Sequence, residues 1–264
     1  MKVGFIGCGN MASAMIGGII KNHLCEAADI TVHDLSPAAM ERAKTAFDVT
    51  LANDNAAVLA QSEMVVLAVK PQFYEEVIRE ISPSVQEGQV IVTIAPGKTL
   101  AWLAETFGKK LPIVRTMPNT PAMVGEGITA VCPNEQVTPE MLASVLKMLG
   151  GFGKAEVIPE RMMDAVVAVS GSSPAYIFML IEAMADAAVA EGMPRQQAYT
   201  FAAQAVLGSA KMVLETGKHP GELKDMVCSP AGTTIEAVQV LEERGFRSSV
   251  MQAMRRCAEK SRSM

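Results

Sequence analysis

The chain has 264 residues, of which 50% are hydrophobic and 19% charged, with a formal net charge of −5. This length allows one large or two modest domains, and the high apolar content excludes disorder. No basic cluster is longer than Lys109–Lys110 or Arg255–Arg256, so we expect no nucleic-acid partner. Five cysteines without CxxC spacing and three histidines favour neither a disulfide framework nor a metal site, and they predict a reducing, cytoplasmic location.

The first twenty residues are nearly uncharged, and Ala12-Ser13-Ala14 resembles a signal-peptide cleavage site. Glycines and Asn10 interrupt this run, so it holds no continuous apolar segment of about 7–15 residues. Glycines also disfavour a membrane helix. The pattern instead predicts a strand over Lys2–Ile6, a tight turn, and a helix from Ala12 to about Asn22.

The turn matches GxGxxA through Gly7, Gly9 and Ala12. A Cβ at Gly7 would obstruct the turn, a Cβ at Gly9 would hold a pyrophosphate away from the backbone, and the small Ala12 lets helix and strand approach. The helix N-terminus supplies N–H donors for phosphate. The motif alone is weak, but its position between strand and helix favours a dinucleotide site.

A second predicted strand, Asp29–His33, ends at Asp34. A carboxylate there can accept hydrogen bonds from an adenosine ribose, which favours NAD, whereas NADP is expected to use a neighbouring Arg. Position 35 is Leu. The alternative for Asp34 is a turn residue that caps the helix beginning at Ser36-Pro37.

Strands alternate with helices through the next hundred residues. Apolar strands are predicted at 63–69, 89–94 and 111–115, each followed by a Pro-containing segment, and further strands at 126–132 and 154–158. This alternation predicts an α/β fold with a doubly wound parallel sheet, whose ligands bind at the carboxyl ends of the strands. Pro159 is the expected boundary between a dinucleotide-binding domain of residues 1–158 and a helical domain of residues 159–264.

Beyond Pro159 the pattern predicts only helices, over 161–169, 174–191, 194–215, 220–228 and 233–261. The helix 174–191 is apolar on nearly every face, and we expect a second subunit to bury it rather than a membrane. Glu182 and Asp186 lie on one face of it, and a structural role is favoured over paired acid–base catalysis.

The segment Ser229–Thr234 is a loop of small residues that runs directly into a helix. Hydroxyl groups at Thr233 and Thr234, with the free N–H groups of the helix start, predict a site for a small carboxylate. A plain Thr N-cap is the alternative, and it accounts for one threonine but not for the whole loop.

Motifs along the whole chain closely resemble those of the pyrroline-5-carboxylate reductases. They are Gly7-x-Gly9-Asn10-Met11-Ala12, Ala68-Val-Lys-Pro71, Arg115-x-Met-Pro-Asn-Thr-Pro121, Ser170-Gly-Ser, Pro174-Ala-Tyr176, and His219-Pro-Gly-Glu-Leu-Lys-Asp225 running into Ser229-Pro-Ala-Gly-Thr-Thr-Ile235. The resemblance implies an N-terminal Rossmann domain, a helical C-terminal domain that forms a homodimer, and assembly of dimers into decamers. It also implies reduction of the cyclic imine 1-pyrroline-5-carboxylate to L-proline, the last step of proline biosynthesis.

The turn chemistry and the resemblance together imply the site residues, and Asn55, Lys70 and Ala95 are implied by the resemblance alone. The expected cofactor-binding residues are Ile6, Gly7, Cys8, Gly9, Asn10, Met11, Asp34, Ser36, Asn55, Ala68, Val69, Lys70, Pro71 and Ala95. The expected substrate-binding residues are Met117, Asn119, Ser229, Gly232, Thr233 and Thr234. Thr234 is also the expected catalytic residue, hydrogen-bonding the ring nitrogen.

Cofactor preference stays open, because Asp34 favours NAD while the family resemblance favours NADP. Two other classes of function are considered. A β-hydroxyacid dehydrogenase of the 6-phosphogluconate type needs a Lys base on a second-domain helix, and the stretch 175–190 contains no Lys. A non-catalytic nicotinamide-binding scaffold would have no reason to keep the loop Ser229–Thr234.

Overall fold

The computed structural model describes residues 1–263 and divides into two compact units. The first, here the sheet unit, contains Met1–Ser172 and the chain from Cys257 onward, and the second, here the helical unit, is Ser173–Arg256. The sequence places the boundary at Pro159, whereas the compact units divide after Ser172. The reason is that the segment after Pro159 packs on the sheet, where Met163 is 2% exposed in a cluster with Ala130 and Cys132.

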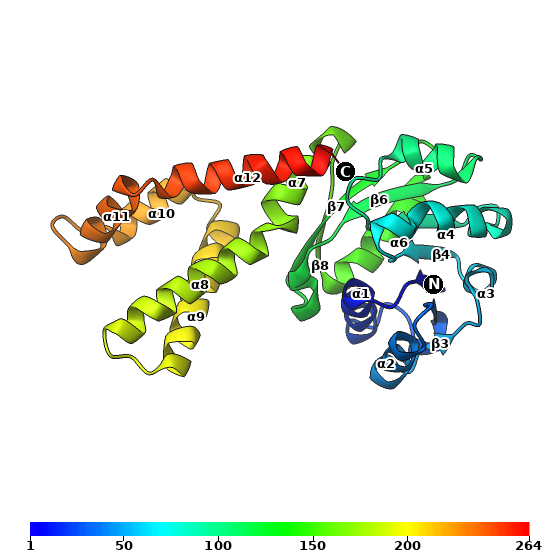
Figure 1. The fold of residues 1–264 in the computed structure, drawn as a ribbon, viewed down its shortest axis with the longest axis horizontal. Helices are drawn as coiled ribbons and strands as arrows, with labels where there is room; N and C mark the ends of the chain where they lie inside the picture. The colour runs from blue at the N-terminus through cyan, green and yellow to red at the C-terminus, as the bar shows by residue number, and fades with distance from the viewer. Residues whose placement is uncertain (264) are drawn as a thin grey trace. The chain divides into compact units, whose positions relative to one another are not determined.

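An eight-stranded sheet forms the sheet unit, in the order β3-β2-β1-β4-β5-β6-β7-β8 (Figure 1). The strands are β1 (Val3–Ile6), β2 (Ile30–His33), β3 (Thr50–Leu51), β4 (Met64–Leu67), β5 (Val90–Thr93), β6 (Ile113–Met117), β7 (Gly127–Pro133) and β8 (Gly153–Val157). The first six are parallel to one another. From β1 the chain adds β2 and β3 on one side, and from β4 it adds β5 and β6 on the other side. The β1–β4 pair is therefore the switch point of a doubly wound fold. The predicted α/β class is confirmed.

The last two strands depart from the predicted all-parallel sheet. β7 pairs antiparallel with β6, and β8 pairs parallel with β7, so both run against the other six. A parallel connection needs a crossover of about a dozen residues or more, usually containing a helix. The link from Met117 to Gly127 is shorter and holds only a 3₁₀ turn, so the chain returns antiparallel.

Within residues 1–263, twelve helices surround the sheet or form the helical unit. They are α1 (Asn10–Lys21), α2 (Pro37–Phe47), α3 (Asn55–Ala60), α4 (Tyr74–Ile81), α5 (Leu100–Phe107), α6 (Pro139–Leu149), α7 (Met163–Val166), α8 (Ser173–Ala190), α9 (Arg195–Thr216), α10 (Pro220–Val227), α11 (Thr233–Glu243) and α12 (Phe246–Arg262). Seven shorter turns connect them, namely the 3₁₀ turns η1 (Ala27–Asp29), η2 (Pro71–Phe73), η3 (Ser82–Ser84), η4 (Thr120–Val124), η5 (Gly150–Phe152) and η6 (Glu160–Met162), and the π-helical turn η7 (Val167–Gly171).

Alternate residues of the central strands β1, β4, β5 and β6 enter two separate cores. Val3 and Phe5 of β1 lie in the core that α1, α2 and α6 cover, whereas Ile6 lies in the core beneath α3, α4 and α5. Successive side chains of a strand point to opposite faces, so a strand covered on both faces is apolar throughout. At about 25 cal/mol per Å², each fully buried Ile or Phe stabilises this unit by roughly 1.5–3 kcal/mol.

The helical unit contains α8 to α11 and most of α12. The predicted single helix over 233–261 is wrong, because Gly245 has φ +73° and separates α11 from α12. One helical stretch, Glu160–Ala190, is long and apolar enough by length and composition to cross a membrane, with a mean hydropathy of 1.5. Most of its second half is the helix predicted over 174–191, whose apolar faces we expect a second subunit to bury.

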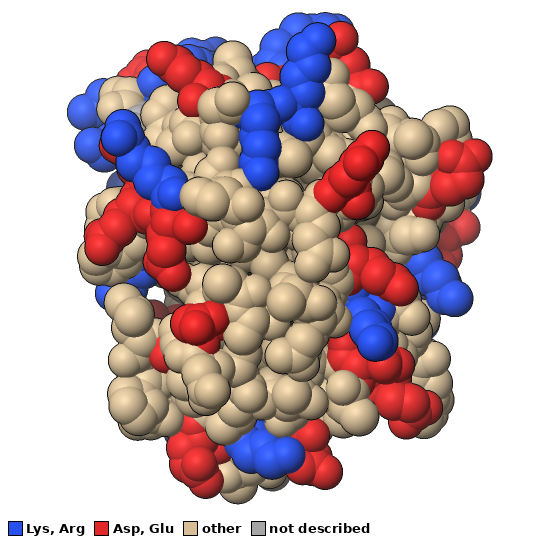
Figure 2. All heavy atoms as spheres, turned by 90° about the vertical axis from the view of Figure 1, so that its right-hand side faces the viewer, with Lys and Arg blue, Asp and Glu red and all other residues tan. Residues whose placement is uncertain are grey.

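Acidic and basic side chains are intermixed on the face of the molecule that Figure 2 shows. Neutral residues separate them, and neither sign forms a continuous stripe across this view. Nucleic-acid-binding surfaces instead concentrate basic residues on one face. The mixture of charges on this face is unlike such a basic surface, as is the net charge of −5.

Candidate active site

The glycine-rich turn between β1 and α1 lies at the carboxyl edge of the sheet. Gly7 has φ +103°, and a Cβ there would lie 2.7 Å from the carbonyl carbon and oxygen of Ala68. Its N–H donates to the carbonyl of His33 at 2.8 Å. Glycine alone adopts this backbone angle without strain and leaves room for the neighbouring chain. Gly7 is therefore required by the fold itself.

Gly9 has a different role, because a Cβ there would meet nothing within 4 Å. Gly9 is the N-cap of α1 without a side-chain cap, and the helix ladder starts with the Ser13 N–H donating to Gly9 at 2.9 Å. The N–H groups of Asn10, Met11 and Ala12 precede that ladder and are directed out of the helix end. Open space in front of these donors and the positive end of the helix dipole fit a pyrophosphate. The residues present therefore fit a dinucleotide.

Asp34 connects the two loops that border this space. One carboxylate oxygen accepts the Cys8 N–H at 2.7 Å, and the other accepts the Ser36 N–H at 2.8 Å. The cap of α2 is Ser36, whose Oγ accepts the Ala39 N–H, so Asp34 is not the capping residue that the sequence left open. Each oxygen keeps lone pairs for a further donor, which a ribose hydroxyl can supply.

Cys8 lies inside the turn and is not a reactive thiol. Burial, and then the negative charge of Asp34, raise the pKa of the Cys8 thiol to about 12. The nucleophilic form of cysteine is the thiolate, so this side chain stays protonated and unreactive at neutral pH. Its contribution to the site is the backbone N–H bound to Asp34.

The other expected cofactor residues lie at the ends of neighbouring strands. Ala68 and Val69 follow β4 and are half-buried, and the Ala68 N–H donates to Ile6 at 2.8 Å. Lys70, at the start of the turn that Pro71 begins, is exposed, and Ala95 after β5 is 3% exposed. The parallel register brings all of them to one edge.

Asn55 is 6% exposed at the start of α3. Its amide nitrogen donates to both oxygens of Glu80, at 3.0 and 3.1 Å. Its Oδ1 has no hydrogen-bond partner among the described residues. A buried oxygen without a partner costs free energy, so Asn55 holds an acceptor for a donor that binds beside it.

Tyr74 is a contributor to this edge that the sequence analysis missed. Its buried hydroxyl donates to the Leu67 carbonyl at 2.5 Å and lies 3.3 Å from the Ile94 N–H, which donates to it. Burial raises the pKa of Tyr74, so the hydroxyl keeps its proton. It therefore joins the carboxyl ends of β4 and β5.

Two expected substrate residues lie at the end of β6 in the sheet unit, where Met117 is the last residue of the strand and Asn119 follows it. The Asn119 side chain is committed within the protein, because Oδ1 accepts the Ile128 N–H at 2.9 Å and Nδ2 donates to Ser170 at 3.1 Å. Met117 is half-buried, and its Cε lies 2.9 Å from where a Cβ on Gly171 would be. One N–H of the Asn119 amide remains for a ligand.

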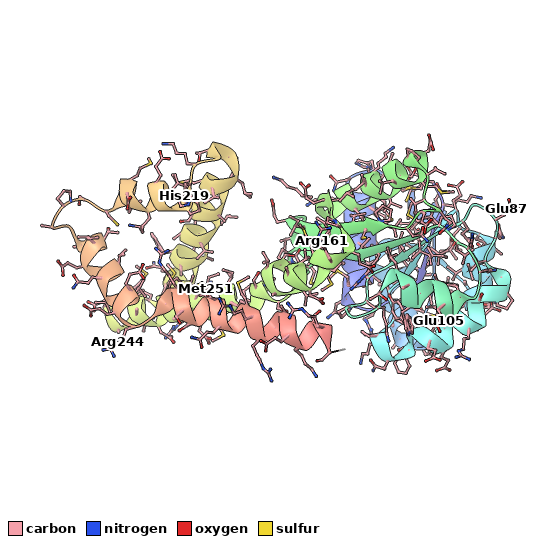
Figure 3. The ribbon with its side chains drawn as sticks, turned by 90° about the horizontal axis from the view of Figure 1, so that it is seen from above. Glu87, Glu105, Arg161, His219, Arg244 and Met251 are labelled. Carbon is pink, nitrogen blue, oxygen red and sulfur yellow. The ribbon has the colours of Figure 1, made fainter. Side chains whose placement is uncertain are left out.

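The remaining expected substrate residues lie in the helical unit, in the loop that follows α10. His219 caps α10 (Figure 3), and after that helix Ser229-Pro-Ala-Gly232 forms a turn closed by the Gly232 N–H donating to Ser229 at 3.0 Å. Ala231 has φ +55°, a left-handed conformation that costs a non-glycine residue about 1–2 kcal/mol. A Cβ on Gly232 would collide with the Ser229 side chain and lie 3.1 Å from its carbonyl. The turn is therefore tightly specified.

Helix α11 begins at Thr233, and its N-cap is Gly232, without a side-chain cap. The alternative of a plain Thr N-cap is therefore wrong. Both Thr233 and Thr234 stand in the first turn, where the N–H groups have no partner within the helix. The two hydroxyls and these N–H donors form a site suited to a small carboxylate and a second polar group. α11 has eleven residues, so its N-terminus carries the partial positive charge of a full helix.

The loop Ser229–Thr234 contains no acidic, basic or histidine side chain. Asp186 forms an exposed ion pair with Arg195, which agrees with the structural role that the sequence favours for it. The described residues contain no group of three metal-ligating side chains. The arrangement therefore suits a reaction in which binding and orientation, rather than strong acid catalysis, lower the barrier.

Two family models match the chain. Residues 160–264 match a model described as pyrroline-5-carboxylate reductase dimerisation, and residues 2–97 match one described as NADP oxidoreductase coenzyme F420-dependent. The first match includes the whole helical unit and the loop Ser229–Thr234. The second includes the glycine-rich turn and Asp34.

Relatives and solved structures match along the whole length. The chain is 54% identical over 263 residues to the pyrroline-5-carboxylate reductase of Escherichia coli strain K12, covering 100% of this chain and 98% of that protein. The structure of a pyrroline-5-carboxylate reductase from Coxiella burnetii has a TM-score of 0.91 and 32% identity, covering 99% and 97% of the two chains. A pyrroline carboxylate reductase from Plasmodium falciparum with NADP bound has a TM-score of 0.90 and 30% identity, covering 100% and 97%.

Proposed function

Because the chain belongs to the pyrroline-5-carboxylate reductase family, we propose that it reduces 1-pyrroline-5-carboxylate to L-proline, with NADH or NADPH as the hydride donor. The observation that carries this proposal is the 54% identity over the whole chain, which includes the loop Ser229–Thr234. Nothing in the chain favours the β-hydroxyacid dehydrogenase or the scaffold.

The nicotinamide cofactor, when bound, supplies the hydride that becomes a C–H bond at the imine carbon. The chain's own residues hold it in place. Gly9 leaves room for the pyrophosphate, the first-turn N–H groups of α1 bind its oxygens, and Asp34 accepts from a ribose hydroxyl. Protonation of the ring nitrogen in solution makes the imine electrophilic, so the protein need not supply a strong acid.

Thr234 is the proposed catalytic residue. Its hydroxyl is placed in the first turn of α11 and can hydrogen-bond the ring nitrogen as it becomes an amine. Ser229, Gly232 and Thr233 are proposed to bind the substrate carboxylate through hydroxyl and backbone N–H groups. Most of the acceleration then comes from orientation in a site with little water.

The cofactor preference belongs to the same proposal. The Asp34 carboxylate, already fixed by two backbone donors, places a negative charge beside the adenosine ribose position and disfavours a 2′-phosphate. We therefore propose NADH as the better donor of the two. This preference is separate from the reaction and is tested separately.

The protein is proposed to be a homodimer formed through its C-terminal helices, with a decamer as the higher assembly. Large apolar side chains are exposed along these helices, among them Phe178, Met179, Phe201, Leu207, Leu214, Leu241 and Met251. An apolar groove of about 470 Å³ lies between α8 and α9. Such a surface is typical of subunit interfaces, and light scattering after size-exclusion chromatography measures the assembly. Five unpaired cysteines support a cytoplasmic location.

The test of the proposed function is oxidation of NADH and NADPH in the presence of 1-pyrroline-5-carboxylate, with proline measured as product. We expect oxidation with both donors and a larger kcat/KM with NADH. Absence of substrate-dependent oxidation with either donor would refute the reaction. A larger kcat/KM with NADPH would refute only the preference.

A further inference from the structure

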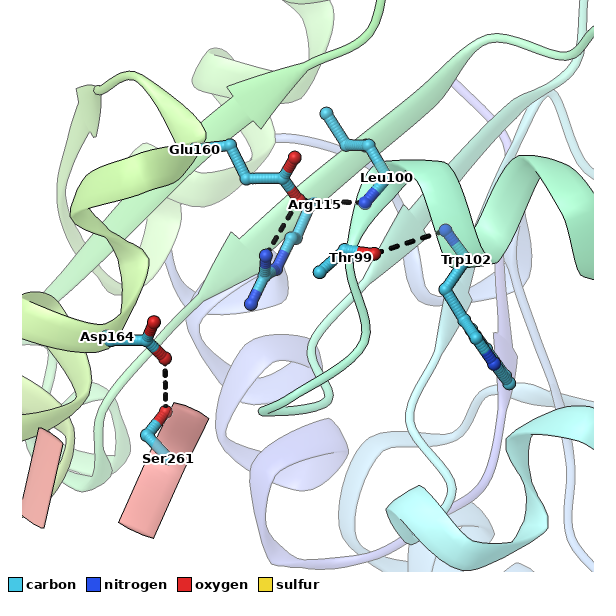
Figure 4. Close-up of polar contacts among 7 residues, drawn as sticks. All are labelled: Thr99, Leu100, Trp102, Arg115, Glu160, Asp164 and Ser261. Carbon is cyan, nitrogen blue, oxygen red and sulfur yellow. Dashed lines mark hydrogen bonds and ion pairs between the residues drawn. The ribbon is translucent and has the colours of Figure 1, made fainter. Parts of the chain in front are cut away.

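A partly buried ion pair lies behind the carboxyl edge of β5 and β6. Arg115 on β6 donates from Nη1 to Glu160 Oε1 at 2.7 Å, and the Leu100 N–H donates to the same oxygen at 2.7 Å (Figure 4). The side chain of Arg115 is 7% exposed and that of Glu160 is 31% exposed. One carboxylate oxygen therefore connects β6, the start of α5 and the segment after β8.

The contact with Leu100 matters because Leu100 is the first residue of α5. Its N–H has no acceptor within the helix, and a carboxylate is the preferred partner at a helix N-terminus. Thr99 caps the same turn by accepting the Trp102 N–H at 3.1 Å. Glu160 and Thr99 together fix where α5 begins and where the preceding loop ends.

That loop, residues 95–99, starts at the end of β5. Tyr74 anchors its first end through the Ile94 N–H, and Glu160 anchors its last end through Leu100. Packing does not hold the loop from every side, because Gly97 and Thr99 line an open cavity of about 320 Å³ that Arg115 and Glu160 also line. Ala95 packs in the core and Lys98 Nζ lies 4.2 Å from the centre of the Trp102 ring, and the polar anchors at the two ends complete the contacts that position the loop.

The position of the loop in the sheet shows which half of a dinucleotide it would contact. The pyrophosphate binds at the β1–α1 turn, and Asp34 beyond β2 places the adenosine on the β2 side. The other half then extends over β4 and β5, so the loop 95–99 borders the nicotinamide. We propose that Glu160, held by Arg115, is a positioning residue for this nicotinamide-side loop. The inference rests on the proposed use of a nicotinamide cofactor.

The test compares NADH with ADP-ribose, which lacks the nicotinamide and its ribose. In the double variant Arg115→Met/Glu160→Leu, both charges are removed together, so no unpaired buried charge is left, and Leu100 loses its acceptor. We expect the calorimetric Kd for NADH to rise about fivefold or more, and that for ADP-ribose to stay within about twofold, because loss of the Glu160 acceptor affects only the loop that borders the nicotinamide. Glu160→Gln keeps the shape with a weaker acceptor, and it should give a smaller effect in the same direction.

The matched control is Glu75→Leu/Arg79→Met, which removes an exposed pair on α4 and should leave both affinities unchanged. If the double variant binds NADH and ADP-ribose equally more weakly than the wild type, the pair has a general structural role and the proposal is overturned. Unchanged affinity for both ligands would also overturn it. If the double variant does not fold, the Glu160→Gln variant tests the proposal by the same comparison, a larger rise in the Kd for NADH than in the Kd for ADP-ribose. Wild-type protein that binds NADH but reduces no imine would refute the proposed function and leave this comparison valid.

Discussion

Gly7 and Gly9 stand two residues apart in one motif, yet the structure predicts opposite consequences of replacing them with Ala. At Gly7 the new Cβ would lie 2.7–2.9 Å from backbone atoms of Ala68 and Val69, at φ +103°. The backbone strain costs about 1–3 kcal/mol and the overpacking about 1–3 kcal/mol. We therefore expect Gly7→Ala to lower the free energy of unfolding by about 2–6 kcal/mol, a large share of a typical 5–15 kcal/mol.

At Gly9 the backbone is ordinary, with φ −75°, and the Cβ has nothing within 4 Å. Ala is a poorer N-cap than Gly by roughly 0.5–1 kcal/mol, and the stiffer unfolded chain returns about 0.4–1 kcal/mol, so stability should hardly change. The methyl group instead occupies the space proposed for the pyrophosphate. Loss of one hydrogen bond to a phosphate, about 1.5–3 kcal/mol, raises the Kd about 10- to 150-fold.

Urea unfolding and NADH titration of the two variants measure these quantities. Gly150→Ala is the matched control, because its Cβ also meets nothing and its position at the end of α6 is remote from the glycine-rich turn. Wild-type NADH affinity in Gly9→Ala would refute the assignment of this space to the pyrophosphate. Wild-type stability in Gly7→Ala would refute the steric argument.

Three further substitutions separate the other parts of the site. Ala231→Gly should raise the free energy of unfolding by about 0.5–1 kcal/mol in urea titrations, because it relieves φ +55° at a smaller entropic cost, and a loss of stability would contradict that. Asp34→Asn should raise the ratio of kcat/KM for NADPH to that for NADH about tenfold. It should also lower the free energy of unfolding by about 1–2 kcal/mol, because the new NH₂ group faces a backbone donor. An unchanged ratio would show that Asp34 does not set the cofactor preference. Thr234→Ala should lower kcat about 10- to 100-fold with NADH affinity unchanged, while Thr234→Ser retains most activity, and full activity of the Ala variant would exclude the proposed role.

Much of the sheet unit could be predicted from the sequence because both faces of its strands are covered. β4 is apolar at every position, β5 is apolar up to Thr93, and the glycine turn has a defined spacing. The short elements β3, α3 and α5 were missed, because their two, six and eight residues give too little periodicity. The directions of β7 and β8 were also missed, since apolar alternation carries no direction and only the short connection before Gly127 does.

The site shows the same division between local and long-range information. The turn residues and the loop Ser229–Thr234 are contiguous in sequence, so their pattern was visible. The Arg115–Glu160 pair joins residues 45 positions apart, and no spacing rule connects them. The signal that the sequence offered is Arg115 itself, because a charged residue within the buried strand Ile113–Met117 needs a partner of opposite charge.

The last helix has a consequence for how the protein is made. Residues from Cys257 onward belong to the sheet unit, where Ser261 donates to Asp164 at 2.7 Å and Cys257 contacts Ser172 at 3.2 Å. The ribosome synthesises these residues only after the whole helical unit has been translated. Domains often fold in order as they emerge, but here the first unit cannot be finished first. A translation product that stops within the helical unit would carry an incomplete nucleotide-binding unit, so a fully formed sheet unit occurs only in chains that also contain the oligomerisation helices.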